Sequence, residues 1–190
     1  LKVSGTVSGS GSYIGCIAGS ITSSTVKNCA SLVDITGSNY IGGIGGYIGG
    51  SSVISGCFNA GSINGAACVG GIAGYVSTAS EISSSYNKGA VSGSASSSSG
   101  VGGIAGGHKS QQPTVKNCFN AGSVSAQGSA NNGGALLGAC KAGKTENCYF
   151  TADSGPDNGK GTAVTSITAQ MLGDAFVQSE DGLLVFVFEF

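Results

Sequence analysis

The stretch Tyr40-Ile-Gly-Gly-Ile-Gly-Gly-Tyr47 decides the fold, because close copies of it recur along the chain. Two strong copies follow it, Cys68-Val-Gly-Gly-Ile-Ala-Gly-Tyr75 and Gly100-Val-Gly-Gly-Ile-Ala-Gly-Gly107. Looser copies lie at residues 13–19 and 132–138, where Cys16 and Ala135 replace the second glycine. Self-similarity at a fixed period is the sequence signature of a repeat fold.

Two further elements follow each copy. One ends in a column of Cys29, Cys57, Ser85, Cys118 and Cys148, and the other is a short alternating run centred on Val7, Ile35, Ile63, Val91 and Val124. The second column has spacings of 28, 28, 28 and 33 residues, so the extra residues belong to one part of the repeat. Ser- and Gln-rich stretches at 94–100 and 109–113 predict loops there.

Each copy supplies three short β-type runs separated by Gly or Ser turns, without a helical period. A single copy cannot bury its apolar residues, whereas copies stacked at about 4.8 Å bury them in columns. The sequence therefore predicts an all-β fold over residues 1–150, a parallel, right-handed β-solenoid of about five coils. The expected inward columns are Ile17/Ile44/Ile72/Ile104/Leu136, Val26/Ile54/Ile82/Val115 and Val7/Ile35/Ile63/Val91/Val124.

Residues 151–190 are expected to form a small C-terminal helix and strand segment that caps the stack or serves in association. Met171, Leu172, Ala175 and Phe176 or Val177 would share one side of a short helix over 168–177. The apolar run 183–190 must pair or be buried, either within this cap or against a neighbouring molecule.

Composition and charge exclude several partners. Eight Lys plus Arg residues balance nine Asp plus Glu, so the chain lacks the basic field that attracts nucleic acid or anionic lipid. No stretch of 18 consecutive apolar residues is present, and membrane insertion is not expected. The 36 glycines follow no Gly-X-Y period, which excludes collagen.

Few residues suggest catalysis or metal binding. The single histidine, His108, lies in a predicted loop without suitably spaced acids, so we expect a solvated side chain and no catalytic role. The loop Asp153-Ser-Gly-Pro-Asp-Asn158 has oxygen-bearing side chains that could hold Ca²⁺, but it lacks the pattern of an EF-hand, and an ordinary turn is the default interpretation. We assign no catalytic, cofactor-binding or metal-binding residue.

The seven cysteines have three readings. The 28- to 33-residue spacing of the cysteine column is unlike that of zinc sites, and side chains stacked in register fit disulfide geometry poorly. A buried thiol ladder, with Ser85 as its polar substitute, is preferred; Cys16, Cys68 and Cys140 lie elsewhere. Two asparagine columns, Asn28/Asn117/Asn147 and Asn59/Asn87/Asn120, predict ladders of amides rather than a ligand site.

The segments Val69-Gly-Gly-Ile-Ala-Gly-Tyr75 and Cys57-Phe-Asn-Ala-Gly-Ser-Ile63 resemble the GLUG motif, a repeat of bacterial surface and secreted proteins. Such proteins include adhesin-like chains and IgA-specific metallopeptidases. The run 167–177 resembles the segment that often closes these arrays. The resemblance implies an accessory module, and the absence of a His-Glu-x-x-His sequence means that peptidase activity is not carried over.

The expected function is that of a non-enzymatic extracellular or cell-surface module, an adhesin segment or stalk that presents its loops to a glycan or to a protein of a host or neighbouring cell. The alternative is a filament subunit, a homo-oligomer joined head-to-tail through its first coil and C-terminal strand. A carbohydrate-active β-helix enzyme ranks third, because the repeat carries Ser, Asn, Gly and scattered Lys where such enzymes cluster acids and bases.

Overall fold

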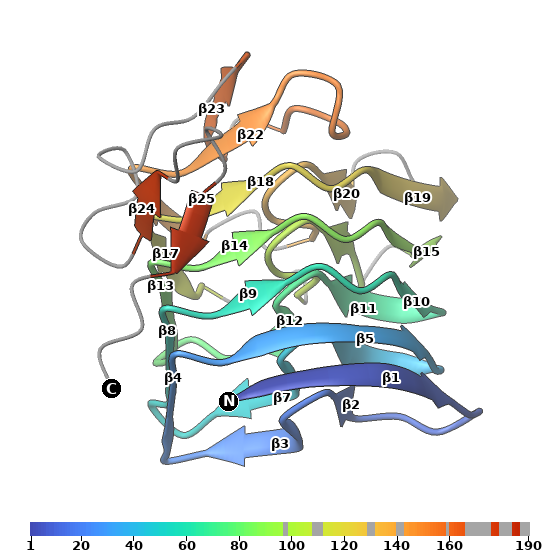
Figure 1. The fold of residues 1–190 in the computed structure, drawn as a ribbon. Helices are drawn as coiled ribbons and strands as arrows, with labels where there is room; N and C mark the ends of the chain where they lie inside the picture. Colours follow the sequence, from blue (N-terminus) through green and yellow to red (C-terminus); the bar gives the residue numbers. More distant parts are fainter. Residues whose placement is uncertain are drawn as a thin grey trace.

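Each copy of the repeat forms one coil of a parallel β-solenoid, and five coils stack along its axis (Figure 1). The structure is a computed structural model that describes residues 1–96, 99–107, 112–128, 132–139, 143–158, 160–165, 176–178 and 184–186. The predicted all-β parallel solenoid is confirmed. Every strand pair between coils is parallel and in register, so that Ile35, Ile63 and Val91 are direct neighbours.

Four sheets, which we name A to D, run along the stack. Within each coil the chain contributes strands to sheet B, then to sheets C, D and A. Sheet B consists of β2 (Ile14–Gly15), β6 (Asn39–Gly42), β11 (Ala67–Gly70), β16 (Val101–Gly102) and β20 (Gly133–Gly134). Sheet C consists of β3 (Ala18–Thr22), β7 (Gly45–Gly49) and β12 (Ala73–Val76), and single bridges continue it to Ala105 and Leu137. Sheet D consists of β4 (Thr25–Lys27), β8 (Val53–Ser55), β13 (Glu81–Ser83), β17 (Thr114–Lys116) and β21 (Lys144–Glu146).

Sheet A divides into two branches. Its first strands are β1 (Lys2–Ser8) and β5 (Ala30–Thr36), and β5 pairs with two shorter strands of the next coil, β9 (Phe58–Asn59) and β10 (Ile63–Gly65). One branch continues through β14 (Tyr86–Asn87), β18 (Phe119–Asn120), β22 (Tyr149–Thr151) and β23 (Thr162–Val164). The other continues through β15 (Val91–Ala95) and β19 (Val124–Gly128).

Two apolar clusters form the core, one on each side of a narrow waist. The larger cluster lies between sheets C and D, and the smaller lies between sheet B and the β10 branch of sheet A. The three predicted inward columns are confirmed in the middle coils, while Ile17 and Val26 of the first coil are half-buried and Val7 in β1 is 41% exposed. Two further buried columns were missed, Ile41/Val69/Val101 and Ile21/Ile48/Val76.

Three local expectations are corrected. A copy supplies at least four β runs rather than three, because the glycine motif contributes one strand before its turn and another after it, as in β6 and β7. Residues 94 and 95 were expected in a loop but complete β15, where they pair with Gln127 and Gly128. Stacking also continues beyond residue 150, since β23 pairs with β22.

The prediction of a helix over residues 168–177 is wrong for its last two residues. Phe176 and Val177 belong to a strand, β24 (Phe176–Gln178), which pairs in antiparallel fashion with β25 (Leu184–Phe186). The apolar tail therefore finds a strand partner within its own chain. Residues 168–175 and the remainder of the tail lie outside the described residues.

Two neighbours on β10 provide a test of the register. Ile63 is fully buried and Asn64 is exposed, so Ile63→Asp should place an unpaired charge in the smaller core cluster and lower the free energy of unfolding by several kcal/mol. Asn64→Asp should change it by about 0.5 kcal/mol or less. Thermal unfolding followed by circular dichroism compares the two, and similar midpoints would contradict the assigned inward face.

Candidate functional site

An asparagine ladder runs through the waist between the two core clusters. Asn59, Asn87 and Asn120 are fully buried, and the amide Nδ2 of each of the first two donates a 2.8 Å hydrogen bond to Oδ1 of the next. Each Nδ2 also donates to the carbonyl two residues onward, of Gly61, Gly89 or Gly122, at 2.8–2.9 Å. These bonds join coil to coil and bend each coil between the two branches of sheet A.

The second glycine of the motif makes room for this ladder. A Cβ on Gly43 would lie 2.5 Å from Cγ of Asn59, and one on Gly71 or Gly103 would lie 2.3 Å from Cγ of Asn87 or Asn120. In the first and last copies both the second glycine and the ladder asparagine are replaced. The first copy has Cys16 and Ser31 at these two positions, and the last has Ala135 and Phe150. The ladder therefore ends where the glycine ends, and the buried Oδ1 of Asn59 has no hydrogen-bond partner on the side of Ser31.

A second, exposed asparagine column forms a turn before each cysteine position. Asn28, Asn117 and Asn147 have φ angles of 54°, 51° and 48°, in the left-handed region that asparagine tolerates better than most residues. Asn147 Nδ2 donates to Asn117 Oδ1 at 3.2 Å. Gly56 and Ser84 occupy the same turn in the other two coils with φ of 60° and 45°, so only this one pair forms an amide contact of the kind we expected.

The cysteine column is buried, as predicted, and Ser85 continues it. The Sγ atoms of Cys29, Cys57, Cys118 and Cys148 lie 3.2–3.4 Å from the carbonyl oxygen two residues earlier. Ser85 Oγ donates to its own equivalent carbonyl, that of Ser83, at 2.8 Å. The six cysteines that the structure describes carry free thiols, and Cys140 and His108 lie outside the described residues.

Burial makes three of these thiols poor nucleophiles. It raises the pKa of Cys57 from 9.0 to about 12, raises that of Cys68 to about 11, and holds that of Cys118 well above its ordinary value. The thiolate is the reactive form of cysteine and the form that binds metals. At neutral pH Cys57 and Cys118 therefore serve packing rather than chemistry, whereas the side-chain hydrogen bond with Cys118 lowers the pKa of Cys148.

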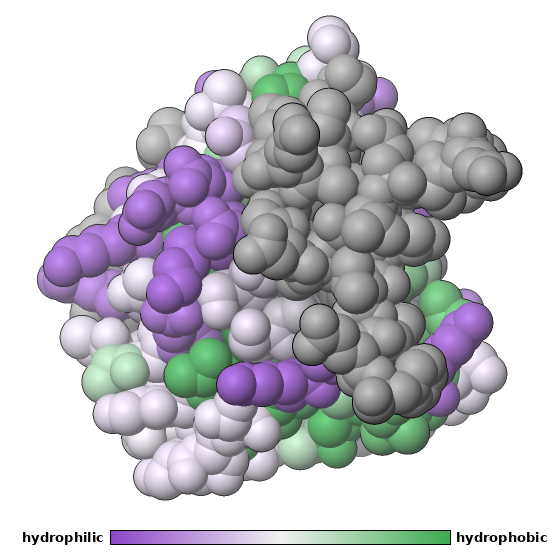
Figure 2. All heavy atoms as spheres, turned by 60° about the vertical axis from the view of Figure 1, so that its left-hand side comes forward, coloured by the Kyte–Doolittle hydropathy of each residue, from purple (hydrophilic) through white to green (hydrophobic). Residues whose placement is uncertain are grey.

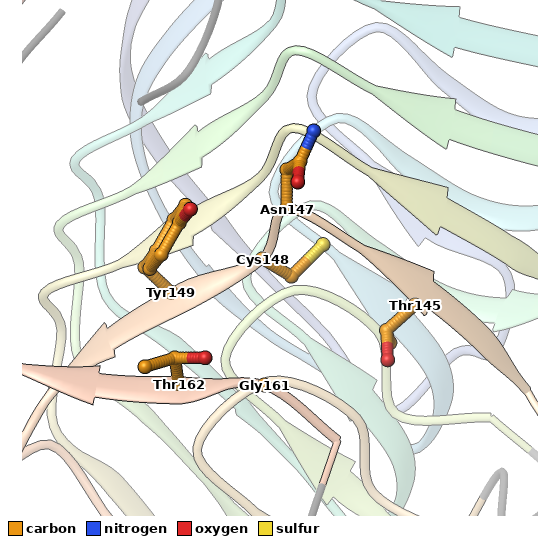
Figure 3. A pocket seen from close by; sticks show the side chains of 6 residues that line it. All are labelled: Thr145, Asn147, Cys148, Tyr149, Gly161 and Thr162. Carbon is orange, nitrogen blue, oxygen red and sulfur yellow. The ribbon is translucent and has the colours of Figure 1, made fainter. Parts of the chain in front are cut away.

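A pocket of about 310 Å³ lies at the last coil, lined by Thr145, Asn147, Cys148, Tyr149, Gly161 and Thr162 (Figure 3). In the described residues β21 is paired on one side, while the neighbouring β22 is covered by β23, so the pocket marks the step where sheet D stops and sheet A continues. Cys148 Sγ already lies 3.3 Å from the carbonyl of Val115, and consecutive Cys148 and Tyr149 project to different sides of the chain. The side chains of Asn147 and Cys148 thus make contacts within the stack.

The acidic loop 153–158 continues the stack instead of standing apart. The carbonyls of Ser154 and Pro156 accept backbone N–H bonds from Val124 and Ala135 at 2.6 and 2.8 Å, and Asn158 Nδ2 donates to the Leu137 carbonyl at 2.6 Å. These contacts are those of a turn that covers the coils beneath it. In the described part of the chain no three His, Cys, Asp or Glu side chains group as a metal site would require.

Charged side chains gather on the outer face of sheet D, which carries Lys27, Glu81, Lys116, Lys144 and Glu146. Lys116 Nζ lies 3.1 Å from Glu81 Oε1 across adjacent coils. Figure 2 shows hydrophilic residues collected on one side of the stack, and hydrophobic surface at the height of the first coil. The exposed apolar residues there include Leu1, Val7 and Leu32.

Four tyrosines form a cluster at the corner between sheets B and C, which sequence reasoning missed. Tyr13 stacks on Tyr40 with ring centres 4.9 Å apart, and Tyr47 stacks on Tyr75 at 5.1 Å. Edge contacts at 6.2 and 5.5 Å join the two stacks. The available signal was the presence of tyrosine at both ends of the motif Tyr40–Tyr47, together with the glycine pairs that fold it back.

This fold and its ladders define a parallel β-solenoid repeat protein. The chain is similar over 97% of its length to 67% of a crystallised Bacteroides ovatus protein that is provisionally named an immunoglobulin A1 protease, with 22% identity and a TM-score of 0.74. At that identity the likeness shows the fold alone. No protein-family profile and no curated protein matches the chain. In the described residues no helix has the length and apolar character needed to cross a membrane.

Because the motif glycine and the ladder asparagine are in contact, substitutions at their equivalents in the first coil should have non-additive effects on stability. Ser31→Asn offers Asn59 a donor but brings its amide against Cys16, so the single variant should lose about 1–2 kcal/mol of stability. Adding Cys16→Gly should recover it, with a coupling energy of about 1 kcal/mol or more, because the pair recreates the arrangement of the second coil. Urea titration of the four proteins measures this, and additive effects would exclude direct contact between the two positions.

The thiol column predicts a loss of stability at alkaline pH. Unfolded Cys57 ionises near 9.0 and folded Cys57 only near 12, so above pH 9 the unfolded state holds fewer protons and the free energy of unfolding falls as the pH rises. Cys57→Ser, which copies Ser85, should fold and should reduce this slope by up to about 1.4 kcal/mol per pH unit. Unfolding measured from pH 8 to 11 tests it, and identical slopes in the two proteins would contradict a buried neutral thiol.

Proposed function

We propose that this chain is a non-enzymatic attachment and display module of an extracellular or cell-surface protein. The observation that carries the proposal is that the side chains best suited to chemistry are used in structural contacts. The asparagines of the waist are used in contacts between coils, the cysteines of the column lie against backbone carbonyls, and burial raises the pKa of several thiols. Apart from the charged face of sheet D, the described surface offers mainly Ser, Asn, Gly and Tyr, residue types that are common in binding sites.

The resemblance to the GLUG motif supports the same proposal, since that repeat is an accessory module of secreted and surface proteins. The Bacteroides ovatus protein matched here carries a protease name, but the shared part is a fold, and folds of this kind host different functions. The present chain contains one histidine and no His-Glu-x-x-His sequence. We therefore place recognition of a glycan or of a cell-surface protein ahead of catalysis.

A second candidate function is assembly into a filament through the first coil. Exposed apolar residues at that end, including Leu1 at 70% and Val7 at 41%, give the candidate its support. The C-terminal strand that we expected to complete this edge is paired with β24, so a second molecule would have to use another surface. Light scattering over a hundredfold concentration range distinguishes the candidates, because a filament subunit grows without limit and an attachment module keeps a fixed mass.

The attachment function can be tested with protein-coated beads. Beads that carry the folded chain should adhere saturably to bacterial or epithelial cell surfaces, and soluble protein should compete for the same sites. Beads that carry the unfolded Ile63→Asp variant provide the control. Adhesion no greater than that of the control on every surface tested would remove the proposed function.

A further inference from the structure

The tyrosine cluster occupies positions that the coil itself does not require to be aromatic. Tyr13, Tyr40 and Cys68 share one column, which continues as Gly100, and Tyr47 and Tyr75 share another, which begins at Ser20 and continues as Gly107. The fourth coil therefore forms the same corner without a tyrosine in either column. The fold therefore does not require the four tyrosine rings that the first three coils carry.

Two of these tyrosines also have an unfavourable backbone. Tyr13 and Tyr40 have φ angles of 61° and 59°, in the left-handed region that large side chains rarely adopt. Such conformations persist where the surroundings hold them, and Cys68, the next residue of the column, shares this one with a φ of 53°. Here a glycine-lined corner holds them: a Cβ on Gly46 would lie 2.6 Å from the Tyr40 carbonyl oxygen, and one on Gly74 would lie 2.5 Å from the Tyr40 carbonyl carbon.

The close approach of the two backbones brings both ends of the motif together on the surface. Tyr13 is 52% exposed, and Tyr40, Tyr47 and Tyr75 are partly exposed. By contrast, the ladder of Phe58, Tyr86 and Phe119 stacks at 5.2 and 5.3 Å with Tyr86 and Phe119 buried, as expected of rings that serve the core. The corner cluster is thus more exposed than the buried aromatic ladder.

The surroundings of the cluster indicate a neutral ligand. No charged residue occurs in the sequence from 35 to 80 or from 3 to 26, the two stretches that contain all four tyrosines. The polar groups beside the rings are hydroxyls and amides, such as Asn39, whose Nδ2 donates to Ser38 Oγ at 3.1 Å and lies 3.4 Å from Ser12 Oγ. A phosphate, an acidic glycan or a nucleic acid would find no countercharge in these stretches.

We infer that the tyrosine cluster binds a neutral glycan, a chain of uncharged hexose units lying along the stack; this inference rests on the proposed attachment function and names its ligand class. Tyrosine combines an apolar ring with a hydroxyl that can exchange hydrogen bonds with the hydroxyls of a sugar. Neighbouring coils are about 4.8 Å apart, which is about the length of one pyranose unit, so successive sugars meet successive coils. A cluster of four partly exposed rings is also smaller than the roughly 800 Å² that a stable protein partner covers.

Tyrosine fluorescence provides a direct measurement, because the chain has no tryptophan and four of its six tyrosines lie in the cluster. The folded chain is titrated with hexamers of glucose, mannose, galactose and N-acetylglucosamine, and with a heparin fragment as the charged comparison. We expect at least one neutral hexamer to change the fluorescence saturably and heparin to leave it unchanged. Binding of heparin alone, or of no neutral hexamer, would overturn the inference.

Variants copied from other coils separate binding from folding. Tyr47→Ser takes its residue from Ser20 and Tyr75→Gly from Gly107, so the double variant should keep the circular dichroism of the solenoid and lose at least tenfold in affinity for the hexamer. Tyr86→Phe, in the buried ladder, is the matched control and should bind like the wild type. Unchanged affinity in the double variant would overturn the inference.

Bead adhesion with the same double variant separates this inference from the proposed function. Loss of adhesion together with loss of hexamer binding supports both. Adhesion that persists in the double variant, or that is competed by a surface protein and not by the hexamer, would show an attachment module with a different ligand site and would remove the glycan inference alone. Absence of adhesion in the wild type would remove the proposed function, whatever the titration shows.

Discussion

The contact between a glycine and an asparagine at the waist of the coil is the constraint on which the rest of the structure depends. Gly43, Gly71 and Gly103 leave room for three buried amides, and those amides bond from coil to coil and to the chain that follows them. A buried amide is costly unless its hydrogen bonds are made, so a ladder of this kind holds neighbouring coils in a single register. The two apolar clusters then pack on either side of a fixed axis.

The parts of the fold that follow from repeat spacing could be predicted from the sequence. Residues such as Ile35, Ile63 and Val91 recur at one distance, and in-register stacking makes each the neighbour of the next. The same logic located the cysteine column and recognised Ser85 as its substitute. The spacing of the repeat indicates which residues of successive coils are in contact, and it was sufficient to predict those contacts.

Contacts across the coil could not be obtained in that way. The approach of Gly46 to Tyr40 joins two backbones without side chains between them, so no apolar pattern marks it. The tyrosine cluster depends on that approach and was missed for the same reason. The C-terminal strand β24 was taken for helix because an isolated apolar segment has the same composition in either state, and only its antiparallel partner β25 decides the outcome.

The in-register ladders also bear on how such a chain can change its length. Removing or adding one whole 28-residue repeat would rejoin each column to its own kind, with the asparagine amides, the thiols and the aliphatic rows still continuous. Because each coil contacts only its neighbours, the physical cost or gain of each such change would be one interface between coils. Changes beyond the third coil would alter the reach of the stack in steps of one coil and leave the corner that carries the tyrosines intact.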